Sequence, residues 1–341
     1  MIIRCSFLIA CVKGKEYKNA QTHDVQRMSH ADQVFRFLKN VGGHVKVTKK
    51  NWSTLANNIV GMRKILSLLF LLTCLFPQPG KSQAVSSEII ATLNIRFNNP
   101  GDGVNAWSNR KERVYKLIQE VNPQILCLQE VLNNQIKDLE KAMPGFGWTG
   151  AGRDDGIEKG EYVPIFYRKD LYKLIRTDNF WLAPDPHTPG LLAWDAACPR
   201  MVTWICLKKK ATGDTLFVFN THFDHIGVKA REMSAKLIVH AADSLAGNHR
   251  TIVTGDFNSS PRDAGYLNVI SGGFADSRLI TQTPPEGPEH TFTGFDITKP
   301  HGDRIDYILV RNLPRLSFYK VRPDHDGKNY YSDHLMVVAG F

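Results

Sequence analysis

The sequence predicts an α/β domain over residues 85–341, and three observations lead to that prediction. Short runs of β-branched and aromatic residues alternate along this region with longer stretches of helical periodicity. The region has 257 residues, which suits one large domain, and no internal repeat or low-complexity linker divides it. Polar residues follow several of the apolar runs directly, as expected where strands end at a functional site.

Nine segments are predicted strands, because each is short, apolar and bounded by polar or turn-forming residues. They span residues 88–95, 124–130, 163–167, 201–208, 215–221, 251–256, 304–310, 316–321 and 335–340. Three longer segments, 109–121, 132–143 and 228–245, are predicted helices. Loops rich in proline and glycine are expected over 183–200 and 283–303.

Two local patterns support the helices. Asn109 stands three residues before Glu112, which is similar to a capping box and predicts that the first helix opens there. Apolar residues recur at helical spacing along the third helix and predict one buried face: Ala230, Met233, Leu237, Ile238 and Ala241.

The net charge of +10 belongs to the first 84 residues. They contain 13 Lys and Arg against 3 Asp and Glu, which leaves 30 of each kind in residues 85–341. The predicted domain is therefore electrically balanced, and a polyanionic partner would need a local basic patch or a metal ion. Lys208, Lys209 and Lys210 are a candidate for such a patch, with a solvated turn as the alternative.

Residues 62–84 are predicted to be a secretory signal peptide. A positively charged start precedes twelve apolar residues, 65–76, and a small-x-small triplet then predicts cleavage after Ala84. The apolar run is shorter than the roughly 20 residues that span a bilayer. A membrane anchor and a lipid anchor at Cys74 are the alternatives. The prediction implies a secreted or periplasmic protein, and residues 1–61 are then expected to be a non-native or disordered extension ahead of the natural start.

Three of the six cysteines lie in the predicted domain, and none of them has CxxC spacing. Cys127 falls inside an apolar run and is expected to be a buried thiol. A disulfide between Cys198 and Cys206 stays open, because an oxidising compartment would permit it.

Several predicted strands lead directly into residues that suit catalysis. These residues are Asn94, Glu130, His222, Asp256 and Asn258. A buried strand cannot easily carry an isolated carboxylate, because an unpaired buried charge is strongly unfavourable. At strand ends the same residues can converge on one hydrated or metal-filled cleft.

The carboxylates and amides favour a hard divalent cation. Glu130, Asp256, Asn258, Asp306 and Asp333 offer oxygen ligands or support them, and the sequence has no Cys/His cluster with zinc spacing. Mg²⁺ is therefore expected, with Mn²⁺ as the alternative. Because Mg²⁺ is commonly held by one or two carboxylates together with phosphate oxygens, a phosphate ester is the expected substrate.

Two short motifs supply acid–base groups. Asp256 and Asn258 stand two residues apart, on one side of an extended segment, where they can hold a water molecule and a phosphoryl oxygen; a plain turn is the alternative. His222 and His334 carry imidazoles whose ordinary pKa lies near the working pH, so they form a candidate general acid–base pair.

Six motifs in this order resemble the endonuclease/exonuclease/phosphatase superfamily. They are Asn94, Leu128–Val131, Asn220–His222, Gly255–Asn258, Arg304–Tyr307 and Ser332–His334. The chain is most similar to a bacterial branch near the deadenylase-type exonucleases, the carbon-catabolite-repressor and nocturnin group, through residues 161–167 and 194–200. The resemblance implies a deoxyribonuclease-like four-layer αββα sandwich, in which two mixed sheets are flanked by helices.

The resemblance also implies metal and water roles. Glu130 would be the principal metal ligand, with Asn94 and Asp333 as further ligands. Asp256 would orient or deprotonate the attacking water, and Asn258 would hydrogen-bond the phosphorus centre.

The two histidines receive roles in the same way. His334 would contact the phosphate or act as a base, oriented by Asp306 or Asp333. His222 would donate to a phosphoryl oxygen or to the leaving oxygen.

Further residues are candidates for contacts with the substrate. They are Tyr162, Arg200 and Asp224, with a surface salt bridge as the alternative for Arg200, while His225 is expected at the rim or in a structural role. Arg96 stands where some abasic-site endonucleases of the superfamily carry an acidic metal ligand, which argues against a close copy of those repair enzymes.

The resemblance favours a nuclease that acts on single-stranded nucleic acid or nucleotides, as an exonuclease or an endonuclease. A sphingomyelinase-like or an inositol- or sugar-phosphatase-like enzyme is the alternative, and a catalytically inactive binding domain is the third hypothesis. A sphingomyelinase would need an exposed apolar hairpin, for which residues 179–182 are a small candidate. A monomer without a stable membrane partner is expected.

Overall fold

The computed structural model describes residues 88–298, 302–313 and 315–341. The predicted extension, 1–61, and the predicted signal segment, 62–84, lie outside the described residues. Within the described ranges, no helix is long and apolar enough to cross a bilayer.

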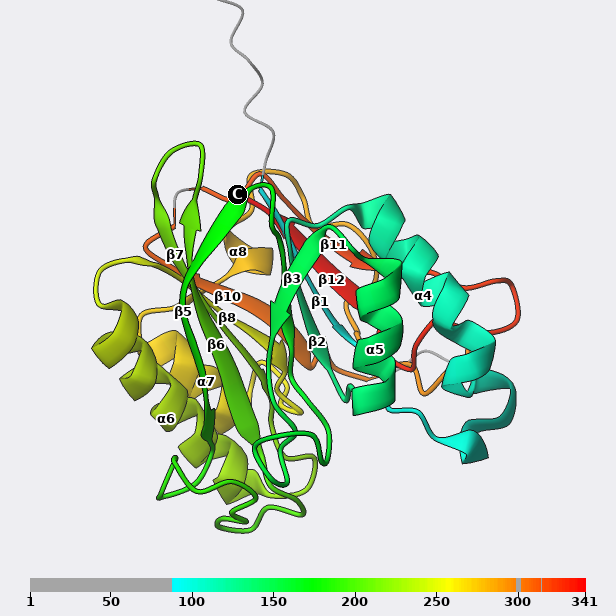
Figure 1. Cartoon of the computed structure of the whole chain (residues 1–341), viewed down its shortest axis with the longest axis horizontal. Helices are drawn as coiled ribbons and strands as arrows, with labels where there is room; N and C mark the ends of the chain where they lie inside the picture. The colour runs from blue at the N-terminus through cyan, green and yellow to red at the C-terminus, as the bar shows by residue number, and fades with distance from the viewer. Residues whose placement is uncertain (1–87, 299–301, 314) are drawn as a thin grey trace, which may run out of the picture. The chain divides into compact units, whose positions relative to one another are not determined.

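Two six-stranded sheets form the centre of the described domain (Figure 1). The first sheet has, in spatial order, β11 (Phe318–Arg322), β12 (Met336–Gly340), β1 (Ile89–Asn94), β2 (Ile125–Gln129), β4 (Ile165–Arg168) and β3 (Phe146–Thr149). β1 and β2 run parallel, whereas the other neighbouring pairs are antiparallel. The sheet is therefore mixed.

The second sheet repeats this arrangement. Its spatial order is β5 (Tyr172–Trp181), β6 (Met201–Lys209), β7 (Thr215–His222), β8 (Arg250–Asp256), β10 (Asp306–Arg311) and β9 (Ala275–Asp276). Here β7 and β8 are the parallel pair, and the other neighbouring pairs are antiparallel.

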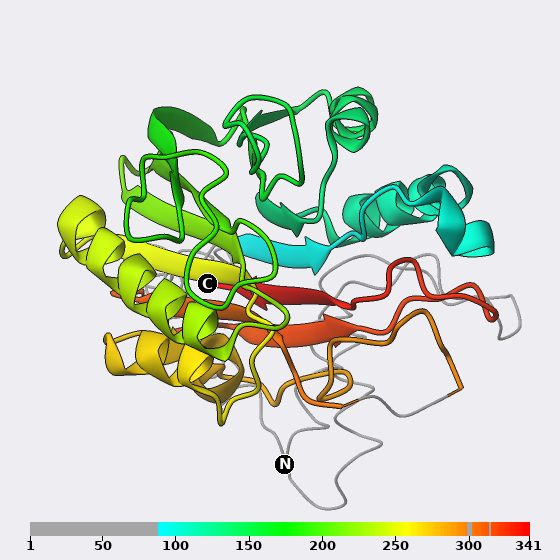
Figure 2. The ribbon, with the colours of Figure 1, turned by 90° about the horizontal axis from the view of Figure 1, so that it is seen from below.

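Helices cover the outer faces of both sheets (Figure 2). They are α4 (Trp107–Val121) and α5 (Asn133–Ala142) on the first sheet, and α6 (Val228–Ala246) and α7 (Ala264–Ser271) on the second. A 3₁₀ helix η1 (Pro100–Asn105) and the short α8 (Ser277–Ile280) lie in connections. One apolar cluster fills the space between the sheets, and each outer face has a cluster of its own. The predicted four-layer αββα sandwich is confirmed.

All nine predicted strands are present, with ends that differ by at most two residues from the prediction. The sequence patterns missed β3, β5, β9, α7 and α8. β5 was missed because it pairs with only β6 and exposes much of its length, so it lacks an apolar run. The predicted capping box is wrong: α4 begins at Trp107 after Ala106, and Nδ2 of Asn109 donates instead to the carbonyl of Gly103.

The three cysteines of the domain are free thiols. Cys127 is fully buried, as predicted. Cys198 and Cys206 do not pair with each other, which excludes the disulfide between them that the sequence permitted.

Candidate active site

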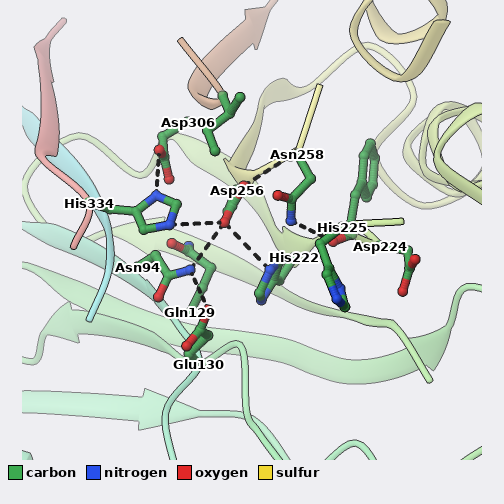
Figure 3. Close-up of polar contacts among 12 residues, drawn as sticks. Asn94, Gln129, Glu130, His222, Asp224, His225, Asp256, Asn258, Asp306 and His334 are labelled. Carbon is green, nitrogen blue, oxygen red and sulfur yellow. Dashed lines mark hydrogen bonds and ion pairs between the residues drawn. The ribbon is translucent and has the colours of Figure 1, made fainter. Parts of the chain in front are cut away.

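The register of the second sheet places three site residues next to one another. His222 lies opposite Asp256 in the parallel pair of β7 and β8, and Asp256 lies opposite Asp306 in the antiparallel pair of β8 and β10. His222 and Asp256 end their strands, while Asp306 begins its strand, so all three reach the same edge of the sheet. Nε2 of His222 lies 3.5 Å from Oδ2 of Asp256 (Figure 3).

His334 reaches the same carboxylate from the segment before β12. Its Nδ1 lies 2.9 Å from Oδ2 of Asp306, and its Nε2 lies 3.6 Å from Oδ2 of Asp256. The ring packs edge-on against Phe292, with a centroid distance of 5.0 Å. Of the two carboxylates predicted to orient His334, Asp306 is therefore the one in hydrogen-bond contact with its ring.

Asn94 at the end of β1 links the carboxylates of the two sheets. Its Nδ2 donates to Oε1 of Glu130 at 3.0 Å and to Oδ2 of Asp256 at 3.1 Å, and its Oδ1 accepts from the backbone N of Arg96 at 3.0 Å. A backbone N–H can only donate, so the amide oxygen must face Arg96 and the amide nitrogen must face the carboxylates. Asn94 thus orients two carboxylates, and its role as a metal ligand stays a prediction.

A buried amide pair holds the two sheets together behind the site. Nε2 of Gln129 donates to Oδ1 of Asn220 at 2.7 Å. Nδ2 of Asn220 in turn donates to the carbonyls of Leu128 and Pro164 in the first sheet. Both side chains are fully buried, so these bonds fix the spacing of the sheets at the point where Glu130 and His222 leave them.

The environment separates the protonation states of the site. Burial and the neighbouring Asp306 carboxylate raise the pKa of Asp256 to about 7. Burial alone would lower the pKa of His334, but the carboxylates of Asp306 and Asp256 outweigh it and raise that pKa well above its usual value. His334 is therefore held as a cation.

His222 has the opposite tendency. Burial, together with the positive charges of Arg200 and Arg153, holds the pKa of His222 well below its usual value. The site thus pairs a charged imidazole with a neutral one on the two sides of Asp256, an arrangement that suits general acid–base chemistry.

Glu130 and Asn258 carry backbone strain at the site. Their φ angles are 59° and 46°, in the left-handed region that a glutamate rarely adopts. The backbone N of Phe97 donates to Oε2 of Glu130 at 3.1 Å, and Nδ2 of Asn258 donates to the carbonyl of Phe223 at 3.0 Å. These bonds hold both side chains toward the cavity although the local backbone is unfavourable.

Arg96 lies among three carboxylates. Its Nε is 3.1 Å from Oδ2 of Asp102 and 3.9 Å from Oδ2 of Asp333, and its Nη1 is 3.8 Å from Oε2 of Glu130. The guanidinium also stacks on Phe97, 4.3 Å from the ring centroid. A fixed positive charge therefore lies within 4 Å of Glu130 and Asp333, the two carboxylates predicted to bind the cation.

A cavity of about 380 Å³ opens at these residues. Six of the eight predicted catalytic and metal-binding residues line it: Glu130, His222, Asp256, Asn258, Asp333 and His334. Asn94 and Asp306 are fully buried behind them. The structure therefore brings all eight predicted catalytic and metal-binding residues to one place.

Sequence reasoning missed two charged residues of the cavity lining. Arg153 and Glu161 come from the loop between β3 and β4 and form a two-pronged salt bridge, with N–O distances of 2.7 and 3.0 Å. Oε2 of Glu161 lies 3.9 Å from Nδ1 of His222. The signal available in the sequence was the spacing of Gly156 and Gly160 between an Arg and a Glu, because these glycines let the loop fold back on itself.

Two predicted substrate contacts need correction. Tyr162 is only 2% exposed and does not line the cavity; its hydroxyl accepts from Asn133 and donates to the carbonyl of Ile157. Asp224 is fully buried behind the cavity wall and supports Arg200 at 3.3 Å. Arg200 itself lines the cavity, and its contact with the substrate stays a prediction.

The donor set fits a hard divalent cation. Glu130 and Asp333 present carboxylate oxygens to the cavity, and Asp256, Asp306 and His334 form a second group whose ligand atoms lie within 4.8 Å of one another. Each Glu130 oxygen accepts a single hydrogen bond from Asn94 or Phe97, which leaves lone pairs for a metal.

Two facing mixed sheets, with carboxylates and two histidines gathered at their shared edge, define a deoxyribonuclease-like α/β fold with a polar cavity at that edge. The chain belongs to the Endonuclease/Exonuclease/phosphatase family, which its sequence matches over residues 91–334. The resemblance inferred from the six motifs is confirmed.

Known structures and relatives agree with this assignment. An endonuclease/exonuclease/phosphatase from Bacteroides vulgatus is 36% identical, with a TM-score of 0.72 over 75% of this chain and 98% of that one. A mannosyl-6-phosphatase of Bacteroides thetaiotaomicron is 33% identical, with a TM-score of 0.70 over 74% and 98%. Mouse 2',5'-phosphodiesterase 12 is 29% identical over a region that makes up 49% of this chain and 31% of the mouse protein.

Proposed function

We propose that this protein hydrolyses phosphate esters with the help of a bound divalent cation, Mg²⁺ or Mn²⁺. The observation that carries the proposal is the position of Asp256, whose Oδ2 lies 3.5 Å from His222 and 3.6 Å from His334. A carboxylate with a pKa of about 7 between a neutral and a charged imidazole suits the activation of water beside a developing negative charge.

Each residue has a role in this proposal. Asp256 orients the water and takes its proton, His334 donates to a phosphoryl oxygen, and Asp306 holds His334 in place and keeps it charged. His222 lies on the other side of Asp256, where it can assist the leaving oxygen. Asn258 supplies a side-chain donor to the phosphoryl group.

Glu130 and Asp333 would hold the cation, with Asn94 orienting Glu130. When bound, the cation supplies positive charge to the phosphoryl oxygens. This charge matters because residues 85–341 carry no overall excess of basic side chains.

The first candidate substrate is a phosphodiester of a nucleic acid or nucleotide. The name of the mouse relative, a 2',5'-phosphodiesterase, supports it. The basic run Lys208–Lys210 does not support a nucleic-acid substrate. The run lies at the end of β6 opposite Arg200, and at about 3.3 Å per strand residue the two are roughly 30 Å apart.

The second candidate is a small phosphorylated sugar. The Bacteroides thetaiotaomicron relative is a mannosyl-6-phosphatase. A cavity of about 380 Å³ lined by charged and hydrogen-bonding side chains suits a compact, polyhydroxylated ligand.

A sphingomyelinase and an inactive binding domain have less support. Phe180, Trp181 and Leu182 are buried, so they offer no apolar hairpin for a sphingomyelin surface. An inactive binding domain would not need all eight catalytic and metal-binding side chains in one cavity. Export through the segment 62–84 and a monomeric state remain part of the proposal.

The test is hydrolysis of a substrate panel in the presence of Mg²⁺ or Mn²⁺. The panel contains single-stranded RNA and DNA, bis-4-nitrophenyl phosphate, mannose 6-phosphate, inositol phosphates and sphingomyelin. Glu130→Gln and His334→Ala should each lower kcat by about 10²–10³-fold. Glu140→Gln is the matched control, because Glu140 is exposed and, in the described part of the chain, accepts only from Trp148 at 2.7 Å. Full turnover by either site variant, or in excess chelator, would refute the proposal.

A further inference from the structure

A small polar recess opens beside His222, next to the main cavity. It has a volume of about 10 Å³ and is lined by Arg153, Glu161, Val163, Arg200, Met201 and His222. Four of these residues also line the main cavity. A space of about 10–15 Å³ holds one water molecule or an atom of similar size.

Hydrogen bonds fix the side chain of Arg200 at this recess. The residue is 5% exposed, its Nε donates to Oδ2 of Asp224 at 3.3 Å, and its Nη2 donates to Nδ1 of His225 at 3.0 Å. The backbone N–H groups of Ile226 and Gly227 hold the other oxygen of Asp224. Two of the three guanidinium nitrogens are thereby used to fix the side chain.

The third nitrogen, Nη1 of Arg200, is buried and has no hydrogen-bond partner among the described residues. The same holds for Nε of Arg153, which lines the same recess. The carboxylate of Glu161 is already paired with Arg153 through both oxygens. A buried donor without a partner lowers the stability of the folded protein. We therefore expect an oxygen acceptor from outside the chain to bind in the recess.

We propose that the recess binds one terminal oxygen of a phosphomonoester, with Arg200 as its cationic donor, and that the protein therefore hydrolyses phosphomonoesters in preference to phosphodiesters. The inference rests on the proposed phosphoesterase activity and deepens it. A monoester dianion has three non-bridging oxygens, whereas a diester has two and carries a second alcohol group in the third position. In the proposed function the cation and His334 take two non-bridging oxygens, which leaves the third position for the recess. A volume of about 10 Å³ holds a terminal oxygen there, but it has no room for an esterified oxygen with its carbon chain.

The reaction balances without any further reagent. A water oxygen forms a bond to phosphorus while the bond between phosphorus and the alcohol oxygen breaks. The alcohol leaves with one proton of the water, and inorganic phosphate remains with the other. Arg200 binds substrate and product through the same terminal oxygen.

The experiment compares 4-nitrophenyl phosphate with bis-4-nitrophenyl phosphate, with Mg²⁺ present, for the wild type, Arg200→Gln and Arg200→Lys. We expect the wild type to favour the monoester in kcat/KM. Arg200→Gln should lower the monoester value by about 10²-fold and the diester value by less than about tenfold, because one charged donor is lost from the terminal oxygen alone. The inhibition constant of inorganic phosphate should rise in parallel, and Arg200→Lys should recover part of both losses.

Arg231→Gln is the matched control. Arg231 donates to the backbone carbonyl of Asp224 at 2.9 Å, but it is not part of the cavity lining, so this variant should keep the monoester preference. Melting temperatures establish that each variant is folded. A wild type that favours the diester, or an Arg200→Gln variant that loses both activities equally with unchanged phosphate inhibition, overturns the inference and leaves phosphoesterase activity standing. A wild type that hydrolyses neither of these esters nor any other member of the substrate panel overturns the proposed function as well.

Discussion

Nδ1 of His334 lies 2.9 Å from Oδ2 of Asp306, and both residues are almost completely buried. Asp306 begins β10, and His334 precedes β12 in the other sheet, so this hydrogen bond joins the two sheets at the site. The second oxygen of Asp306, Oδ1, is buried without a partner among the described residues, so the charge of the carboxylate is directed mainly at the imidazole.

Asp306→Asn should therefore lower kcat by about 10²–10⁴-fold while the protein remains folded. An asparagine keeps the shape of the side chain but cannot stabilise a positive imidazole or hold it in the same tautomer. Steady-state kinetics and a melting curve measure the effect. Asp303→Asn is the control, because Asp303 is exposed and pairs with Arg262. A variant with more than half of the wild-type kcat would exclude Asp306 from the mechanism.

A second prediction concerns Arg96 and the metal. Its guanidinium lies 3.8 Å from Oε2 of Glu130 and 3.9 Å from Oδ2 of Asp333, the two carboxylates predicted to bind the cation. Like charges about 4 Å apart repel by up to about 4 kcal/mol near a protein surface, and even a third of that is tenfold in affinity. Arg96→Gln should therefore bind Mn²⁺ about tenfold more tightly.

Isothermal titration of the purified protein with Mn²⁺ measures this affinity without any substrate. Arg262→Gln is the control, because Arg262 is largely exposed and does not line the cavity. Equal or weaker Mn²⁺ binding by Arg96→Gln would mean that the guanidinium does not compete with the metal.

The strand ends explain why so much of the site was predictable. A strand places its last residue at a known edge of the sheet, so apolar runs ending in Asn94, Glu130, His222 and Asp256 predicted one shared cleft. The pairing of His222 with Asp256 across β7 and β8 then follows from register.

Loop residues were less predictable, for a physical reason. Arg153 and Glu161 reach the cavity only because their loop folds back, with Trp181 donating to the carbonyl of Arg153 at 2.7 Å. No periodicity encodes such a path. The burial of Tyr162 and Asp224 also depends on tertiary contacts. From the sequence alone, a polar residue next to a motif can equally support a neighbouring side chain or contact the substrate.

A third prediction concerns Asp224 and acid stability. Burial alone would raise the pKa of Asp224, but the backbone donors of Gly227, Ala197 and Ile226 and the charge of Arg200 outweigh it, so the pKa lies below its usual range. A folded-state pKa below the unfolded value of about 3.9 means that the ionised group stabilises the protein above that pH. The contribution is lost as the pH falls toward the folded-state pKa.

Asp224→Asn should therefore cost about 2–4 kcal/mol of unfolding free energy at pH 7, and less at pH 3. Urea unfolding at both values measures the difference between variant and wild type. Asp178→Asn, at an exposed carboxylate on β5, should cost little at either pH. A cost that is the same at pH 7 and pH 3 would contradict the role of the ionised carboxylate.

The last prediction concerns Gly255, the residue before Asp256. Gly255 has φ = 133°, and a Cβ at this position would lie 1.9 Å from the backbone carbonyl oxygen of Thr221 in β7. β7 and β8 can approach closely here only without a side chain, and this close pairing sets His222 beside Asp256. Gly255→Ala should therefore lower the unfolding free energy by more than about 2 kcal/mol. Any folded fraction should be nearly inactive, because the strands must separate.

Gly145→Ala is the control, since a Cβ there meets no atom within 4 Å. Thermal unfolding and kcat are measured on both. A Gly255→Ala variant with wild-type melting temperature and kcat would show that the strand contact does not position the catalytic pair.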